Sequence, residues 1–246
     1  MEKKRQIAAV LILLALIGVI AYRHSTGKDL EKYEASFFDV FDTQTQIIGY
    51  ASSKEQFSEQ MSLIKDKFQY YNDLYDIYHD YEGMNNIKTI NDNAGIQPVK
   101  VDEEIIELLK LGITMDEKTD GNMNIAMGSV LSIWHDYREA GSEDPYSAEL
   151  PPMDELERAA EHTDIHNIVI DEEASTVYLT DPDMSLDVGS IGKGYAVQKV
   201  AEYANLGSGI CFFRSGEMCA LLADTRMEAH GRSEFRIPMW RVVRHI

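Results

Sequence analysis

The chain has 246 residues, of which 44% are hydrophobic and 26% are charged, and its formal net charge is −19. Leu, Ile and Val recur along the whole length, which excludes a disordered polyanion, and the length is enough for one globular domain or two small ones. The negative charge excludes a binding mode in which the whole chain attracts the phosphates of a nucleic acid, so we expect no nucleic-acid partner.

The charge is unevenly distributed: residues 1–23 carry +3, residues 24–205 carry −24 and residues 206–246 carry +2. The first segment has three basic residues, 3–5, ahead of an almost wholly apolar stretch from Ile7 to Tyr22. A short apolar stretch behind a basic flank is typical of a secretory signal or an uncleaved membrane anchor, and less so of a buried core helix. We therefore expect an N-terminal hydrophobic helix that leaves the acidic body on the extracytoplasmic face of a cell membrane.

The acidic body begins with a predicted strand, because residues 37–50 alternate between apolar and polar. Ser52 or Ser53 is expected to cap a long helix, since apolar residues then recur at steps of three and four. The predicted stripe of core residues on this helix is Phe57, Met61, Ile64, Phe68, Tyr71, Tyr75 and Tyr78.

Three further helices are expected. One begins after Asp102, a second is opened by Pro151 and Pro152 and runs to about Ala160, and the last covers residues 192–203. Between the last two, residues 165–170 and 176–180 predict a hairpin. These elements do not alternate as strand–helix–strand units, so the predicted fold class is α+β, with mixed helices and antiparallel strands.

The most informative stretch runs from Ser185 to Val197. Its carboxylate, Asp187, ends a short apolar run, and a glycine-rich turn then enters a helix that carries Lys193. Glycines let a ligand approach the backbone, and the free amides at a helix start favour anions. The pattern fits a phosphate-bearing ligand, and equally a tight strand-to-helix turn. Its spacing matches neither a Walker loop nor the dinucleotide glycine motif.

A second stretch runs from Thr119 to Gly128. Asp120-Gly121 is a turn signal, and the side chains of Asn122 and Asn124 could bind the edge of an aromatic ligand or simply their own backbone. Taken alone, this stretch favours a turn.

Together the two stretches resemble the ApbE family, the FAD:protein FMN transferases. That family carries Thr-Asp-Gly-x-x-Asp-x-x-x-Gly ending in an apolar Leu-Trp, and later Asp-Leu-Gly-x-Ile-x-Lys-Gly-Tyr-Ala. The counterparts here are residues 119–128 with Ile133-Trp134, and residues 187–196. Tyr81, followed by Ile90-Asn91, is similar to the family's Tyr before its Ile-Asn element. The resemblance covers residues 37–203.

The resemblance implies a magnesium-dependent transfer of the FMN half of FAD to a threonine of another exported protein, with release of AMP. It assigns FAD as a substrate, Mg²⁺ as the metal and an exported flavin-acceptor protein as the partner. By the same resemblance Ser190 lends an oxygen to the metal. The residues that match flavin-binding positions are Phe41, Tyr81, Asn122, Met123, Asn124, Asp187 and Lys193.

The sequence also departs from the family pattern. Asn124 replaces the family's usual Asp, and residues 41–43 stand where Met-Gly-Thr is typical. The family's Gly-Gly-Asn and His-Ile-Asp-Pro elements, and its late metal-ligating Asp and Thr, have no counterpart. Without those ligands, a flavin- or nucleotide-binding protein that lacks transfer activity is an alternative. An acidic partner-binding ectodomain is a third.

We therefore expect three parts: a signal or membrane anchor at 1–23, an incomplete ApbE-like flavin transferase domain at 24–205, and an atypical tail at 206–246. The tail holds no Lys, six Arg and both Cys, and its pattern predicts no regular element. A truncation or a shifted reading frame near Asn205 is the expectation, and a genuine divergent tail is the alternative. The seven His residues form no metal-binding motif, so we expect surface or capping roles for them.

Overall fold

A computed structural model of the chain describes residues 31–41, 43–146, 148–205, 211–215 and 218–221. The hydrophobic stretch expected to form an N-terminal helix lies outside the described residues. Among the helices that are described, none is long and apolar enough to cross a membrane.

One layer of the molecule is an antiparallel sheet with strand order β1-β2-β6-β7. The strands are β1 (Glu31–Val40), β2 (Thr43–Ala51), β6 (Cys211–Ser215) and β7 (Met218–Leu221). The sequence predicted a single strand over 37–50, and this prediction is wrong. The chain reverses at Phe41, which adopts a left-handed backbone with φ of 56°. The strands β6 and β7 lie in the segment 206–246, where no element was predicted, and β6 pairs with β2.

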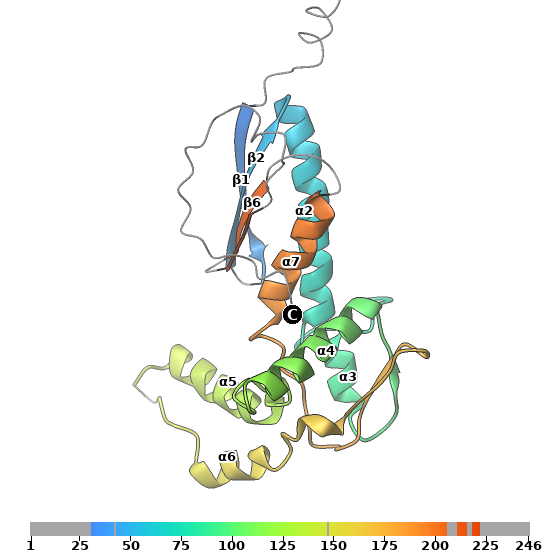
Figure 1. The fold of residues 1–246 in the computed structure, drawn as a ribbon. Coiled ribbons are helices and arrows are strands. Elements are labelled where there is room, and N and C mark those ends of the chain that lie inside the picture. The colour runs from blue at the N-terminus through green and yellow to red at the C-terminus, as the bar shows by residue number, and fades with distance from the viewer. Residues whose placement is uncertain (1–30, 42, 147, 206–210, 216–217, 222–246) are drawn as a thin grey trace, which may run out of the picture.

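Two helices, α2 (Lys54–Tyr75) and α7 (Gly192–Asn205), pack on each other and on this sheet (Figure 1). The cap of α2 is Ser53, whose side chain accepts a hydrogen bond from the amide of Gln56. The predicted stripe is buried as far as Tyr75. It is wrong at Tyr78, which is 53% exposed, because α2 has already ended.

The end of α2 has a local cause. Asp76 follows the helix, and its Oδ1 accepts hydrogen bonds from the amides of Tyr78 at 2.6 Å and His79 at 3.3 Å. A short acidic side chain that binds nearby amides competes with the helical pattern, so the chain turns there. Tyr78 is thereby turned out of the core stripe.

The other part of the molecule lies below the sheet layer in Figure 1 and contains the remaining helices. They are α3 (Ile87–Asp92), α4 (Glu103–Lys118), α5 (Gly128–Glu143) and α6 (Met153–Ala160). A small antiparallel sheet of order β3-β5-β4 is formed by β3 (Val99–Lys100), β5 (Thr176–Leu179) and β4 (Ile168–Asp171). The predictions of α4, α6, α7 and the β4–β5 hairpin are confirmed, whereas α5 was not predicted as a helix.

A hydrophobic core continues through both parts, from Ile47 in the sheet to Leu109 in α4 and Val177 in the hairpin. The architecture of mixed helices and antiparallel strands confirms the α+β class. Two connections position the two informative stretches of the sequence. The helix α4 leads directly into residues 119–128, and the extended segment 184–188 leads directly into α7.

Candidate active site

The two stretches singled out by sequence lie side by side. The amide of Asp187 donates to the carbonyl of Ile125 at 2.9 Å, and the amide of Gly128 donates to the carbonyl of Ser185 at 3.1 Å. These two backbone hydrogen bonds join segments that are far apart in sequence. The structure therefore brings the two stretches together at residues 125–128 and 185–187, and Asp187 is the predicted flavin-binding residue that takes part in the contact.

A glycine makes this approach possible. A Cβ atom at Gly128 would lie 2.4 Å from Oγ of Ser185 and 2.6 Å from its carbonyl oxygen. No side chain tolerates such distances, so this position admits glycine alone unless the two segments separate.

Asn91 holds the second stretch from its other side. Its Nδ2 donates to the carbonyl of Leu186 at 3.0 Å, and its Oδ1 accepts from the amide of Leu186 at 2.8 Å. The side-chain amide of Asn91 thus takes the place of a neighbouring strand. The position was noted in the sequence as part of the Ile-Asn element, but no local pattern indicated this contact.

The start of α7 forms an electropositive corner. Oδ1 of Asp187 accepts from the amide of Gly189 at 2.8 Å, which closes the turn ahead of the helix. Lys193 is half-buried in the first turn and has no hydrogen bond or ion pair to any other described residue, while Ser190 is exposed. In the first turn of α7 the amides of Gly192 and Tyr195 already donate to the carbonyls of Val188 at 2.7 Å and Ile191 at 2.9 Å. The first-turn amides of Lys193 and Gly194 are therefore the ones that, with the cation, are suited to an anion.

The side chains of residues 122–124 are largely engaged with backbone. Nδ2 of Asn122 donates to the carbonyl of Thr119 at 2.6 Å, and Nδ2 of Asn124 donates to the carbonyl of Thr163 at 2.8 Å. Oδ1 of Asn124 accepts from the amide of Ala126 at 2.7 Å. Met123 is partly buried and packs on the core. These bonds give both Asn residues the turn-forming role that was one of the two alternatives from sequence.

The remaining two predicted flavin-binding residues lie on other segments. The amide of Phe41, in the β1–β2 turn, donates to Oδ1 of Asn72 at 2.8 Å. The hydroxyl of Tyr81 donates to Oδ2 of Asp76 at 2.7 Å, and burial together with this bond raises the pKa of Tyr81. Among the described residues, no hydrogen bond joins either of them to the two stretches.

Two paired aromatic residues were not assigned to a site by the sequence reasoning. The rings of Tyr78 and His135 lie 5.0 Å apart at an interplanar angle of 31°. Burial, and after it the negative charge of Asp187, raises the pKa of Tyr78. Tyr78 had been assigned to the core stripe, and His135 lies on the unpredicted helix α5, so neither carried a signal of a site.

The comparisons with known proteins agree with this geometry. The sequence profile described as the ApbE family matches residues 41–211. The chain belongs to the ApbE family. This finding confirms the resemblance drawn from the two stretches.

Individual ApbE relatives are similar over part of their length. A FAD:protein FMN transferase from Klebsiella pneumoniae (strain 342) is 25% identical over 164 residues, which are 67% of this chain and 50% of that protein. One from Treponema pallidum (strain Nichols) is 29% identical over 121 residues, 47% of this chain and 32% of that protein. The chain thus spans half the length, or less, of these curated relatives.

Solved ApbE structures show the same fold. The ApbE protein from Thermotoga maritima has a TM-score of 0.67 at 23% identity, over 80% of this chain and 60% of that one. Flavin Transferase ApbE from Vibrio cholerae has a TM-score of 0.64 at 18% identity, over 80% of this chain and 61% of that one. At these identities the likeness shows the fold alone.

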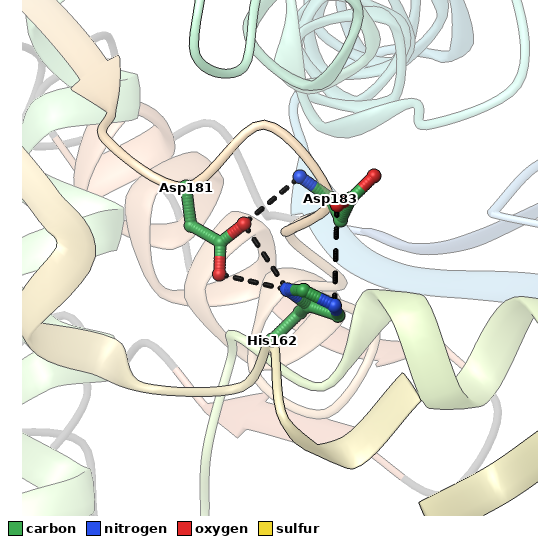
Figure 2. A group of neighbouring side chains, drawn as sticks. All are labelled: His162, Asp181 and Asp183. Atoms are coloured by element: carbon green, nitrogen blue, oxygen red, sulfur yellow. Dashed lines mark hydrogen bonds and ion pairs between the residues drawn. The ribbon is translucent and has the colours of Figure 1, made fainter. Parts of the chain in front are cut away.

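The ApbE family resemblance implies a magnesium ion, so we tested which residues fit one. Among the described residues, His162, Asp181 and Asp183 form a group whose nitrogen and oxygen atoms lie within 4.8 Å of one another (Figure 2). Magnesium takes oxygen ligands, and Nδ1 of His162 is already 2.9 Å from Oδ2 of Asp181. This group is therefore an ion pair that does not fit magnesium, and the exposed hydroxyl of Ser190 remains the candidate ligand.

We expect this ion pair to make stability depend on pH. The hydrogen bond to Asp181 raises the pKa of His162, and the same bond lowers the pKa of Asp181. When folding raises the pKa of a histidine, its charged form stabilises the fold at pH values below the pKa in the unfolded chain. This contribution is lost as pH rises through the pKa in the folded chain. Replacing His162 with Gln should therefore lower the melting temperature at about pH 5.5 and change it much less at about pH 8.5.

The control is His166→Gln, since the ring of His166 is exposed and has no hydrogen bond to another described residue. Its effect should be small and equal at both pH values. An equal loss of melting temperature for His162→Gln at both values would show that the pair contributes through packing rather than charge.

Proposed function

We propose that this ApbE-family chain binds FAD and transfers its FMN half to a threonine hydroxyl of an exported acceptor protein, releasing AMP in a magnesium-dependent reaction. The observation that carries the proposal is Lys193, a half-buried cation without a described partner in the first turn of α7, a helix that follows Asp187 and its backbone bond to Ile125 of the other stretch. The names of the relatives support the same activity.

In this proposal the chain binds FAD mainly through its diphosphate. Lys193 and the first-turn amides of α7 meet the phosphate oxygens, because a cation and free N–H groups both favour negative charge. We assign the segment 119–124, which leads into the residues bonded to Asp187, and the aromatic residues Tyr78 and Tyr81 to the flavin end of this region. They would enclose the flavin end and orient the phosphorus that reacts.

The transfer exchanges one P–O bond for another. The threonine oxygen forms a bond to the phosphorus of the FMN phosphate, the bond from that phosphorus to the bridging oxygen breaks, and AMP leaves with that oxygen. The threonine loses its hydroxyl proton in the same step, and that proton passes to water. Most of the work of such a reaction is positioning and charge stabilisation, which a rigid anion site supplies.

Ser190 would contribute one oxygen to Mg²⁺, which in proteins keeps several waters and takes others of its ligands from substrate phosphates. When bound, the ion neutralises charge on the diphosphate. Because the chain has a net charge of −19, it repels a diphosphate, and a metal cation in addition to Lys193 would reduce this repulsion. We further propose that residues 1–23 anchor the protein at the extracytoplasmic face of the membrane, where an exported acceptor would be met.

One observation favours a second function. Within the described residues, Ser190 is the single oxygen ligand that we assign to the metal, so a chain that binds flavin without transferring it is the alternative. Binding and transfer are separable by experiment.

The test is an intact-mass assay. The full chain in detergent is incubated with FAD, Mg²⁺ and a threonine-bearing acceptor domain from an exported flavoprotein. We expect an added FMN mass on the acceptor and free AMP, with neither when the acceptor threonine is replaced by Ala or when Mg²⁺ is chelated. FAD binding without added mass would favour the alternative, and folded protein that binds no FAD would contradict both.

A further inference from the structure

A polar cluster attaches α7 to α4 behind the proposed anion site. We name it the α4–α7 cluster, and its members are Glu104, Glu107, Tyr195 and Lys199. Nζ of Lys199 lies 3.1 Å from Oε2 of Glu104 and also contacts Oε2 of Glu107. The hydroxyl of Tyr195 donates to the same Oε2 of Glu107 at 2.8 Å. Two residues of one helix are thus held by two residues of the other.

Two members of the α4–α7 cluster are more shielded than a second ion pair that involves α4. The side chains of Lys199 and Glu104 are 21% and 27% exposed and that of Glu107 is 45% exposed, whereas those of Lys110 and Glu172 are 51% and 64% exposed. Burial lowers the pKa of Lys199, but hydrogen bonds to Glu107 and Glu104 outweigh it and raise that pKa, while the bond to Lys199 lowers the pKa of Glu107. The groups stay charged, and loss of one leaves a shielded partner uncompensated.

The α4–α7 cluster continues a face of α7 that begins at the anion site. Gly192, Tyr195 and Lys199 are spaced by three and four residues, so they share one helix face. A Cβ atom at Gly192 would lie 3.5 Å from Cδ2 of Tyr75, at the end of α2. The rings of Tyr75 and Tyr195 also lie 6.5 Å apart, so packing against α2 and the bonds to α4 together oppose rotation of α7 about its axis.

Rotation of α7 matters because Lys193 is next to Gly192 and projects from a neighbouring face of the same turn. The partner helix matters as well, since α4 ends at Lys118 and leads into residues 119–128. The α4–α7 cluster thus connects the helix that carries one stretch of the site with the helix that precedes the other. Neither acidic residue is used by the proposed chemistry.

We propose that Lys199 and Glu107 are positioning residues, which fix the rotation of α7 and so direct Lys193 and the first-turn amides at the diphosphate of FAD. The inference rests on the proposed function for the identity of the ligand. It predicts that damage to the cluster weakens binding of the phosphate-bearing part of the ligand and spares the flavin ring.

The experiment compares FAD with riboflavin, which has the same ring and no phosphate, in fluorescence titrations of the full chain. Lys199→Met should raise the Kd for FAD about tenfold and change the Kd for riboflavin less than about twofold. Glu107→Gln, which keeps the size of the side chain, should do the same to a smaller degree. Lys199→Arg should restore FAD binding. Lys110→Met breaks the exposed pair with Glu172 and should change neither constant.

If Lys199→Met weakened the binding of FAD and of riboflavin equally, the proposal would be overturned and the cluster would have only a structural role. An unchanged FAD constant would overturn it as well. If the wild-type chain binds neither compound, the proposed function fails, and hydrogen exchange then tests the positioning by itself. Amides 189–194 should exchange faster in Lys199→Met than in Lys110→Met. Equal exchange rates in the two variants would overturn the positioning role of Lys199.

Discussion

Replacing Lys193 with Met is expected to raise the Kd for FAD by about ten- to a hundredfold, because hydrogen bonds to charged groups contribute about 1.5–3 kcal/mol. The side chain is half-buried and has no partner among the described residues, so its charge is available to the ligand and its loss leaves no protein group unpaired. The fold should therefore tolerate the change. Isothermal titration with FAD in the presence of Mg²⁺ measures the effect.

The control is Lys54→Met, which removes the same charge from an exposed position at the start of α2. This variant should bind FAD as the wild type does, because distant exposed charges are screened by salt. An equal loss of affinity in both variants would mean that net charge, and not the corner at α7, governs binding. An unchanged Kd for Lys193→Met would remove the central support of the proposed function.

Replacing Gly128 with Ala is expected to lower the free energy of unfolding by about 2–3 kcal/mol, as overpacking of a tight contact does. The new methyl group would fall 2.4 Å from Oγ of Ser185, and relief requires the backbone segments of the two stretches to move apart. That movement also breaks the bond between the amide of Gly128 and the carbonyl of Ser185. Urea denaturation of the full chain measures the loss.

Gly141→Ala, on the same helix α5, provides the matched control. A Cβ atom there would lie 3.1 Å from that of Ala148, so its cost is limited to a shift of a few tenths of an ångström in the exposed backbone at Ala148. Alanine is also the better helix former by about 1 kcal/mol, which offsets that adjustment. If Gly128→Ala were as stable as Gly141→Ala, the close approach of the two stretches in the structure would be wrong.

The two substitutions address different properties of one site. Lys193 supplies charge to the ligand, whereas Gly128 allows the segments that carry the predicted flavin-binding residues to meet. Lys193 lies in the first turn of α7 in an otherwise acidic chain, and Gly128 is buried at the start of α5. An anion can approach this chain favourably at such a corner because the local amides and cation outweigh the repulsion of more distant charges, which salt screens.

The sequence by itself determined the elements whose signals are local. The helix α2 was predicted because Ser53 can cap it and apolar residues recur at helical spacing, and α4 was predicted from Asp102 for the same reason. The family was also recognisable, since residues 119–128 and 187–196 carry two motifs in the expected order. The site residues on these motifs could therefore be named before their positions were known.

Only the tertiary structure decided where the chain reverses and which segments meet. The chain turns at Phe41 with a positive φ, although the residue types there do not indicate a turn. Tyr78 leaves the helical stripe because the side chain of Asp76 accepts a hydrogen bond from its amide. The hydrogen bonds between Asn91 and Leu186 join residues that are 95 positions apart in the sequence. Hydrophobic periodicity indicates which face of an element is buried, but not which other element packs against that face. Contacts between distant segments, including the α4–α7 cluster and the side-by-side arrangement of the two stretches, therefore leave no local pattern and arise only when the chain packs.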